Sequence, residues 1–80
     1  MQRLAAKLHT VKAAQVIRRI TELGGVQTRQ RGSHRMFTAT KAGVTAQTTV
    51  PDHGARDLGP GLVRAIERQM EPVFGKGWLR

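Results

Sequence analysis

A chain of 80 residues is long enough for one small domain, and without cysteine it has neither a disulfide framework nor a cysteine-ligated metal site. Fourteen Lys and Arg residues oppose five Asp and Glu residues, which gives a formal net charge of +9. This excess predicts a polyanionic partner, and the candidates are RNA, DNA, an acidic protein and an anionic membrane surface.

The chain divides by composition into three parts. Residues 1–9 are expected to form an N-terminal extension, helical or frayed, before a domain over 10–71 and an apolar tail over 72–80. No segment resembles a signal peptide or reaches the length of a membrane span. A cytoplasmic protein that does not enter a membrane is therefore expected.

The first helix is predicted from the stretch TVKAAQVIRRITELGG. Its apolar residues recur at helical spacing and form one stripe, which consists of Ala13, Val16, Ile17, Ile20 and Leu23. Thr10 is the expected N-cap, and Gly24 or Gly25 is expected to end the helix.

Three strands are predicted next, over VQTRQR, HRMFTAT and VTAQTTV. Gly32 and Ser33 make the first turn or a bulge, and the sequence KAG makes the second turn. Pro51 and the following DHG end the third strand. Short strands with such tight connections predict an antiparallel meander.

The second helix is predicted over GPGLVRAIERQM, with Pro60 near its start. The tail EPVFGKGWLR is interrupted by proline and glycine, so it is expected to end the helix and either to fold back on the core or to meet a partner. The order α-β-β-β-α predicts an α+β fold. It is a two-layer sandwich with both helices on one face of a three-stranded antiparallel sheet.

Strand alternation predicts the face that His34 takes. Phe37 is the only aromatic residue in the predicted strands and should lie under the helices. His34, three residues earlier, then points to the opposite, open face. Gln30 and either Arg29 or Arg31 would supply polar neighbours there. A one-residue bulge would reverse this assignment.

The residues support one kind of enzyme chemistry. His9, His34 and His53 are not spaced as a metal site and no acidic cluster assists them, so neither a metal nor another cofactor is expected. No phosphate-binding loop, nucleophile elbow or carboxylate pair is present in the sequence. Acid–base catalysis by His34 remains, and the alternative reading of His34 is an ordinary exposed strand residue.

Four short motifs in the right order resemble the HicA (YcfA-like) toxins of bacterial toxin–antitoxin systems. ITELGG ends the first helix, and GSHRMF begins eight residues after Gly24. TVPDHG is similar to the VPxH element of the family, and LGPGLVRAI is similar to the segment that leads into its last helix. Two positions depart from the family pattern: Leu62 stands where a small hydroxyl residue is usual, and Gly25 where an aromatic residue is frequent.

The resemblance implies a fold like that of a double-stranded RNA-binding domain. It also implies the activity of an mRNA endonuclease that arrests translation, and a HicB-like antitoxin whose acidic surface masks the active site. Carried over by motif position, His34 is the catalytic residue, with Gly32 and Ser33 as its neighbours in the motif.

The expected mechanism is metal-independent RNA cleavage with His34 as general base on a ribose 2′-OH. His53 is the candidate for a second acid or base. Five basic residues are candidates for RNA contacts, namely Arg29, Arg31, Arg35, Lys41 and Arg56. One alternative is a non-catalytic RNA- or DNA-binding module, and another is a protein that binds only an acidic partner.

Overall fold

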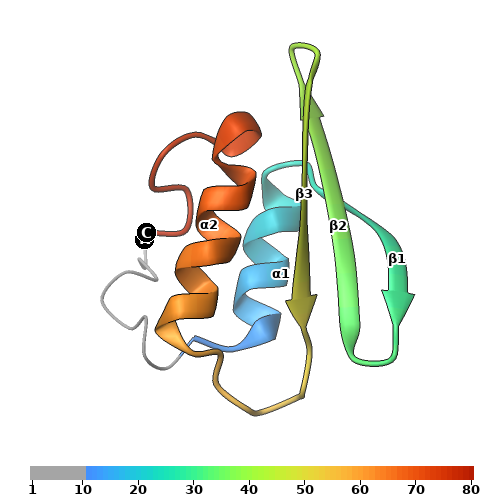
Figure 1. Cartoon of the computed structure of the whole chain (residues 1–80), viewed down its shortest axis with the longest axis vertical. Coiled ribbons are helices and arrows are strands. Elements are labelled where there is room, and N and C mark those ends of the chain that lie inside the picture. The colour runs from blue at the N-terminus through green and yellow to red at the C-terminus, as the bar shows by residue number, and fades with distance from the viewer. Residues whose placement is uncertain (1–10) are drawn as a thin grey trace.

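A computed structural model describes residues 11–80 of the chain (Figure 1). Its elements are α1 (Ala13–Glu22), β1 (Val26–Arg31), β2 (His34–Lys41), β3 (Val44–Pro51) and α2 (Pro60–Phe74). The expected α-β-β-β-α order is confirmed. The extension expected over residues 1–9 lies outside the described residues, as does Thr10.

Helix α1 begins at Ala13, because Lys12 caps its first turn. The Lys12 N–H donates to Gln15 Oε1 at 2.7 Å, and the Lys12 carbonyl accepts from the Gln15 N–H at 3.1 Å. The N-cap expected at Thr10 is therefore wrong. A reciprocal pair of contacts between Lys12 and Gln15 takes the place of a hydroxyl cap.

Helix α1 ends at a pair of glycines. Gly24 has a φ of 100°, and its N–H donates to the Thr21 carbonyl at 3.1 Å. The Gly25 N–H donates to the Ile20 carbonyl at 2.8 Å, which completes a Schellman motif. The expected stop at this glycine pair is confirmed, and it turns the chain into β1.

The three strands form one antiparallel sheet in the order β1–β2–β3. The turn between β2 and β3 is Ala42-Gly43, with φ values of 52° and 80° that are typical of a type I′ turn. The turn between β1 and β2 is Gly32-Ser33, where Gly32 has a φ of 58°. Two-residue turns leave little freedom in how the strands pair.

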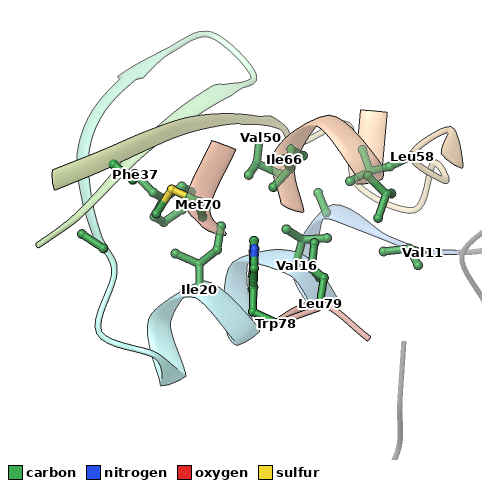
Figure 2. Close-up of a cluster of buried hydrophobic side chains, with 14 of the residues drawn as sticks. Val11, Val16, Ile20, Phe37, Val50, Leu58, Ile66, Met70, Trp78 and Leu79 are labelled. Carbon is green, nitrogen blue, oxygen red and sulfur yellow. The ribbon is translucent and has the colours of Figure 1, made fainter. Parts of the chain in front are cut away.

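Both helices lie on one side of the sheet, and the core fills the space between the layers (Figure 1). Phe37 is 2% exposed and belongs to this core, as the strand alternation predicted. Figure 2 shows the largest side chains of the core, which include Val16, Ile20, Val50, Ile66, Met70, Trp78 and Leu79. The arrangement is an α+β sandwich like that of a double-stranded RNA-binding domain.

Strand β1 differs from the other two strands, because all six of its residues are exposed. The helices pack mainly against β3 and β2, so β1 extends beyond their cover at the far edge of the sheet (Figure 1). Its sequence VQTRQR is polar apart from Val26. β1 is therefore a solvent-facing, basic edge of the molecule.

Helix α2 runs through Pro72 to Phe74, so the expected end of the helix before Pro72 is wrong. Proline removes one helical hydrogen bond. Continuing the helix nevertheless buries Val73 and sets Phe74 edge-on to Trp78, with ring centroids 5.0 Å apart. Trp78 Nε1 then donates to the Glu67 carbonyl at 2.7 Å, so the tail folds back on the core.

Residues of both helices hold the end of the tail. Arg19 Nε donates to the Trp78 carbonyl at 3.0 Å, and Leu79 is buried. Arg80 Nε lies 3.3 Å from Glu67 Oε2, without the alignment of a hydrogen bond. Glu67 is buried, so the nearby guanidinium compensates a carboxylate that would otherwise be costly in the interior.

Candidate active site

The turn between β1 and β2 lies beside the start of the β3–α2 loop, at one end of the sheet. His34, the first residue of β2, is opposite Pro51, the last residue of β3. The pairing continues one step further, because the Asp52 N–H donates to the Ser33 carbonyl at 2.7 Å. His53 follows directly and is exposed, as is His34. The segments that carry these two histidines are thus brought to the same end of the sheet.

The side chain of His34 belongs to the open face of the sheet, as predicted, because Phe37 at the opposite parity is buried in the core. Arg31 lies directly opposite His34, and Arg29 lies opposite Met36. Directly opposed residues of antiparallel strands share a face. An exposed imidazole and two exposed guanidinium groups therefore occupy one face.

A bulge in β1 decides which of its residues share the His34 face. Thr28 is the extra residue, at the point where the register shifts. In a regular ladder Gln30 would lie opposite His34, but with the bulge Arg31 takes that position. The same shift turns Arg29 to this face. Alternation alone left Gln30 and the two arginines as candidate neighbours of His34 on the open face. With the bulge, the two arginines lie on that face.

A chain of polar side chains runs beneath the β1–β2 turn, on the face opposite His34. Arg35 Nε donates to Asp52 Oδ2 at 2.9 Å, and Arg35 Nη1 donates to Gln27 Oε1 at 3.3 Å. Gln27 Nε2 donates to Gln30 Oε1 at 3.2 Å, and Gln30 Nε2 donates to the Gly32 carbonyl at 3.0 Å. We call this chain the turn network. It ties the turn that precedes His34 to β1, to β2 and to the start of the β3–α2 loop.

Sequence reasoning did not single out Asp52 or Gln27, and it wrongly expected Gln30 on the His34 face, whereas Gln30 lies opposite Arg35. The partner of Arg35 in β1 depends on the bulge, which no local pattern marks. Asp52 carries a clearer signal, since it is an acidic residue directly before His53 in a turn sequence. Its Oδ1 accepts from the Gly54 N–H at 3.2 Å, an Asx-turn contact that such a sequence favours.

Two of the three other predicted RNA-contacting residues, Arg35 and Lys41, lie apart from His34. Arg35 is ion-paired on the opposite face. Lys41 ends β2 seven residues away, which is roughly 24 Å along a strand that rises about 3.4 Å per residue. Arg56 is exposed in the β3–α2 loop, and its N–H donates to the His53 carbonyl at 3.5 Å. The basic side chains that the structure brings together with the imidazole are thus the two arginines of β1.

The exposed groups at this end of the sheet favour proton transfer beside a bound anion. The imidazoles of His34 and His53 can move a proton, and the guanidinium groups of Arg29 and Arg31 can bind phosphate. Among residues 11–80, no three His, Asp or Glu side chains gather closely enough to hold a metal ion. Within the same residues, no helix is both long enough and apolar enough to cross a membrane.

Comparison with known proteins gives one match. A family model described as HicA toxin of bacterial toxin–antitoxin matches residues 13–71. The matched segment starts at the first residue of α1, includes the whole sheet and the β3–α2 loop, and ends within α2. No curated protein and no solved structure matches the chain.

Proposed function

The chain belongs to the HicA toxin family of bacterial toxin–antitoxin systems, and from this premise we propose that it is an endoribonuclease that cleaves mRNA at His34. One observation carries the proposal: the exposed imidazole of His34 shares a sheet face with two exposed arginines. Arg31 lies directly opposite His34, and Arg29 lies opposite Met36. Phosphate contacts by arginine would place an RNA strand across the imidazole. The site of action is the cytoplasm, where mRNA is available.

In the proposed reaction, His34 takes the proton of a ribose 2′-OH as that oxygen attacks the adjacent phosphorus. The bond from phosphorus to the 5′-oxygen breaks, and the products carry a 2′,3′-cyclic phosphate and a 5′-OH. Arg31, opposite His34, stabilises the charge that develops on the phosphate oxygens. DNA has no 2′-OH and is not a substrate.

The leaving 5′-oxygen requires a proton, and two groups can supply it. The imidazolium of His34 holds the proton taken from the 2′-OH. His53 is exposed one residue after Asp52, whose N–H is bonded to the residue before His34. We assign His53 the role of second acid, since the two loops are held side by side.

The antitoxin partner implied by the family would cover this face. The chain carries a formal net charge of +9, and its arginines on β1 are exposed. A HicB-like protein with an acidic surface would bind the same groups that bind phosphate. RNA and antitoxin would therefore compete for the His34 face.

The test compares RNA cleavage by the purified chain and by His34→Ala in EDTA, with the ends of the products analysed. The expected result is cleavage by the wild-type chain that leaves cyclic phosphate and that falls by roughly 10²–10⁴-fold in the variant. The variant should still retard RNA in a gel. His34 is exposed, so its loss leaves the core unchanged.

Other outcomes would point elsewhere. A folded wild-type chain that retards RNA without cutting it is a non-catalytic binding module. Equal cleavage by both proteins means a contaminating nuclease or a wrong choice of base, and His53→Ala is then compared. Cleavage that stops in EDTA would contradict metal independence.

A further inference from the structure

A shallow cleft of about 190 Å³ lies where β3, the edge strand next to the helices, meets α2. Its strand side includes Met36, Gln47 and Thr49, and its helix side includes Leu62, Ala65 and Gln69. Pockets that enclose a drug-sized ligand measure about 300–1,000 Å³. This cleft is smaller and open, so it suits a single planar group.

The cleft follows the edge of β3 from one face of the sheet to the other: Thr48 faces α2, whereas the remaining strand residues belong to the His34 face. Met36 is two residues after His34 and therefore has the same parity. Thr49 lies directly opposite Met36 and shares its face. Two residues of a strand span about 7 Å. A nucleotide next to a phosphate at His34 is therefore within reach of the cleft.

The cleft has one apolar pair and one polar pair of walls. Met36 and Leu62 are partly exposed and supply flat apolar contact. Gln69 Oε1 accepts from the buried Thr48 hydroxyl at 2.6 Å, which fixes the amide, and its NH₂ has no hydrogen-bond partner in the part of the chain that the structure describes. The Gln47 amide has no hydrogen-bond partner among residues 11–80. Carboxamides of this kind match the hydrogen-bonding edges of bases.

Leu62 supplies the apolar wall on the helix side of the cleft. Its side chain is 37% exposed, although leucine is apolar. A small hydroxyl residue would remove most of that apolar wall.

We propose that the cleft receives an unstacked base of the RNA strand whose phosphate lies at His34, with Met36 and Leu62 against its plane and the amides of Gln47 and Gln69 at its edge. The inference rests on the proposed function. Single-stranded RNA is commonly read in this way, by bases splayed into small pockets. The cleft would then set which nucleotide is preferred beside the cut.

The experiment is an NMR titration of the full chain with a short 2′-O-methyl oligoribonucleotide, which has bases and phosphates but no free 2′-OH. The expected result is a shift of the Met36 methyl signal and of the Gln47 and Gln69 side-chain amides. Met70 is fully buried, so its methyl signal is the internal reference. Replacing one nucleotide by an abasic residue should abolish these shifts and preserve those of Arg29 and Arg31.

A matched pair of variants tests the apolar wall. Leu62→Thr should weaken binding of the intact oligonucleotide by about fivefold or more, the lower end of what one stacked base contributes. It should leave binding of the abasic oligonucleotide unchanged. Leu23→Thr changes a leucine of nearly equal exposure, 36%, at the end of α1 and should alter neither affinity.

The outcomes separate this inference from the proposed function. If RNA shifts the NMR signals of the β1 arginines but not the Met36 methyl signal, the proposal for the cleft is wrong and the proposed RNA site at His34 stands. No binding of RNA at all overturns both. If an acidic peptide shifts the Met36 methyl and the two amides and RNA does not, the cleft binds protein and the inference is wrong.

Discussion

Asp52 is a residue with three separate contacts around His34. Its carboxylate accepts from Arg35 and from the Gly54 N–H, and its own N–H donates to the Ser33 carbonyl. The ion pair is partly exposed, so it contributes only about 0.2–1 kcal/mol to folding. Its larger effect is on position, since it holds the turn before His34 against the loop that carries His53.

We predict that Asp52→Ala lowers kcat for RNA cleavage by about tenfold or more and leaves RNA affinity and folding nearly unchanged. The physical reason is that small displacements of a catalytic group are costly, about 10²-fold for 1 Å. Asp57→Ala is the matched control, because Asp57 lies in the same loop and pairs with Lys12 instead. Equal losses of kcat in both variants would show that only the lost charge matters.

Gly25 is a second residue whose environment makes a prediction. A Cβ at this position would lie 3.0 Å from the Ile20 carbonyl oxygen and would also contact the Ile20 side chain. We therefore expect Gly25→Ala to destabilise the chain by about 1–3 kcal/mol. Urea unfolding measures this as a lower midpoint.

Gly61→Ala is the control for that substitution. Gly61 lies in α2, and a Cβ there has open space around it. Alanine in a helix is favoured over glycine by about 1 kcal/mol, so this variant should be more stable than the wild type. If the two variants shifted the midpoint in the same direction, the contact with Ile20 would not be the cause.

At the scale of elements, the bulge in β1 is the feature that sets the charge of the His34 face. Deleting Thr28 and deleting Gln30 both shorten β1 by one residue and both restore a regular ladder. After the first deletion Arg29 still lies opposite Met36. After the second deletion Thr28 takes that position, and Arg29 turns to the other face.

We predict that the Thr28 deletion retains RNA binding and that the Gln30 deletion weakens it. The measurement is RNA affinity, with circular dichroism to show that both chains fold. Gln30→Ala is the control, since it removes the Gly32 contact of the turn network without moving Arg29. A Gln30 deletion that binds RNA as well as the Thr28 deletion would mean that Arg29 does not contact the strand.

Strand alternation predicted the strands and the His34 face correctly. Phe37 is buried, and because side chains alternate between the two faces of a strand, His34 must then lie on the other face. Other elements depended on distant residues. The sequence predicted that α2 ends before Pro72, because proline is unfavourable within a helix. The helix continues past Pro72 because Phe74 packs against Trp78, a contact that the local sequence does not indicate. The turn network likewise joins Arg35 to Asp52, 17 residues away, so it had no short-range pattern.

At the scale of the whole molecule, the net charge of +9 attracts RNA, but the salt dependence of binding reports only the phosphates that basic side chains contact. For single strands, the slope of log affinity against log salt is about −0.7 per phosphate neutralised. We predict that Arg29→Gln and Arg31→Gln each reduce the steepness of this slope by about 0.7. Affinity measured over a series of salt concentrations gives the slope.

Arg18→Gln is the control for these charge changes, because Arg18 is an exposed arginine on α1 and lies away from the sheet face. It lowers the net charge by the same amount but lies away from the proposed RNA site, so it should leave the slope unchanged. A slope that fell equally in all three variants would indicate a diffuse attraction between the whole chain and RNA.

The packing of the tail has a consequence for synthesis on the ribosome. Arg19 and Trp78 are bonded although 59 residues separate them, and Trp78 and Leu79 lie in the same core as Val16 (Figure 2). The nascent chain cannot close this core until residue 79 has left the exit tunnel. On the proposed function, RNA cleavage would begin only after the tail has packed against the core that supports the sheet.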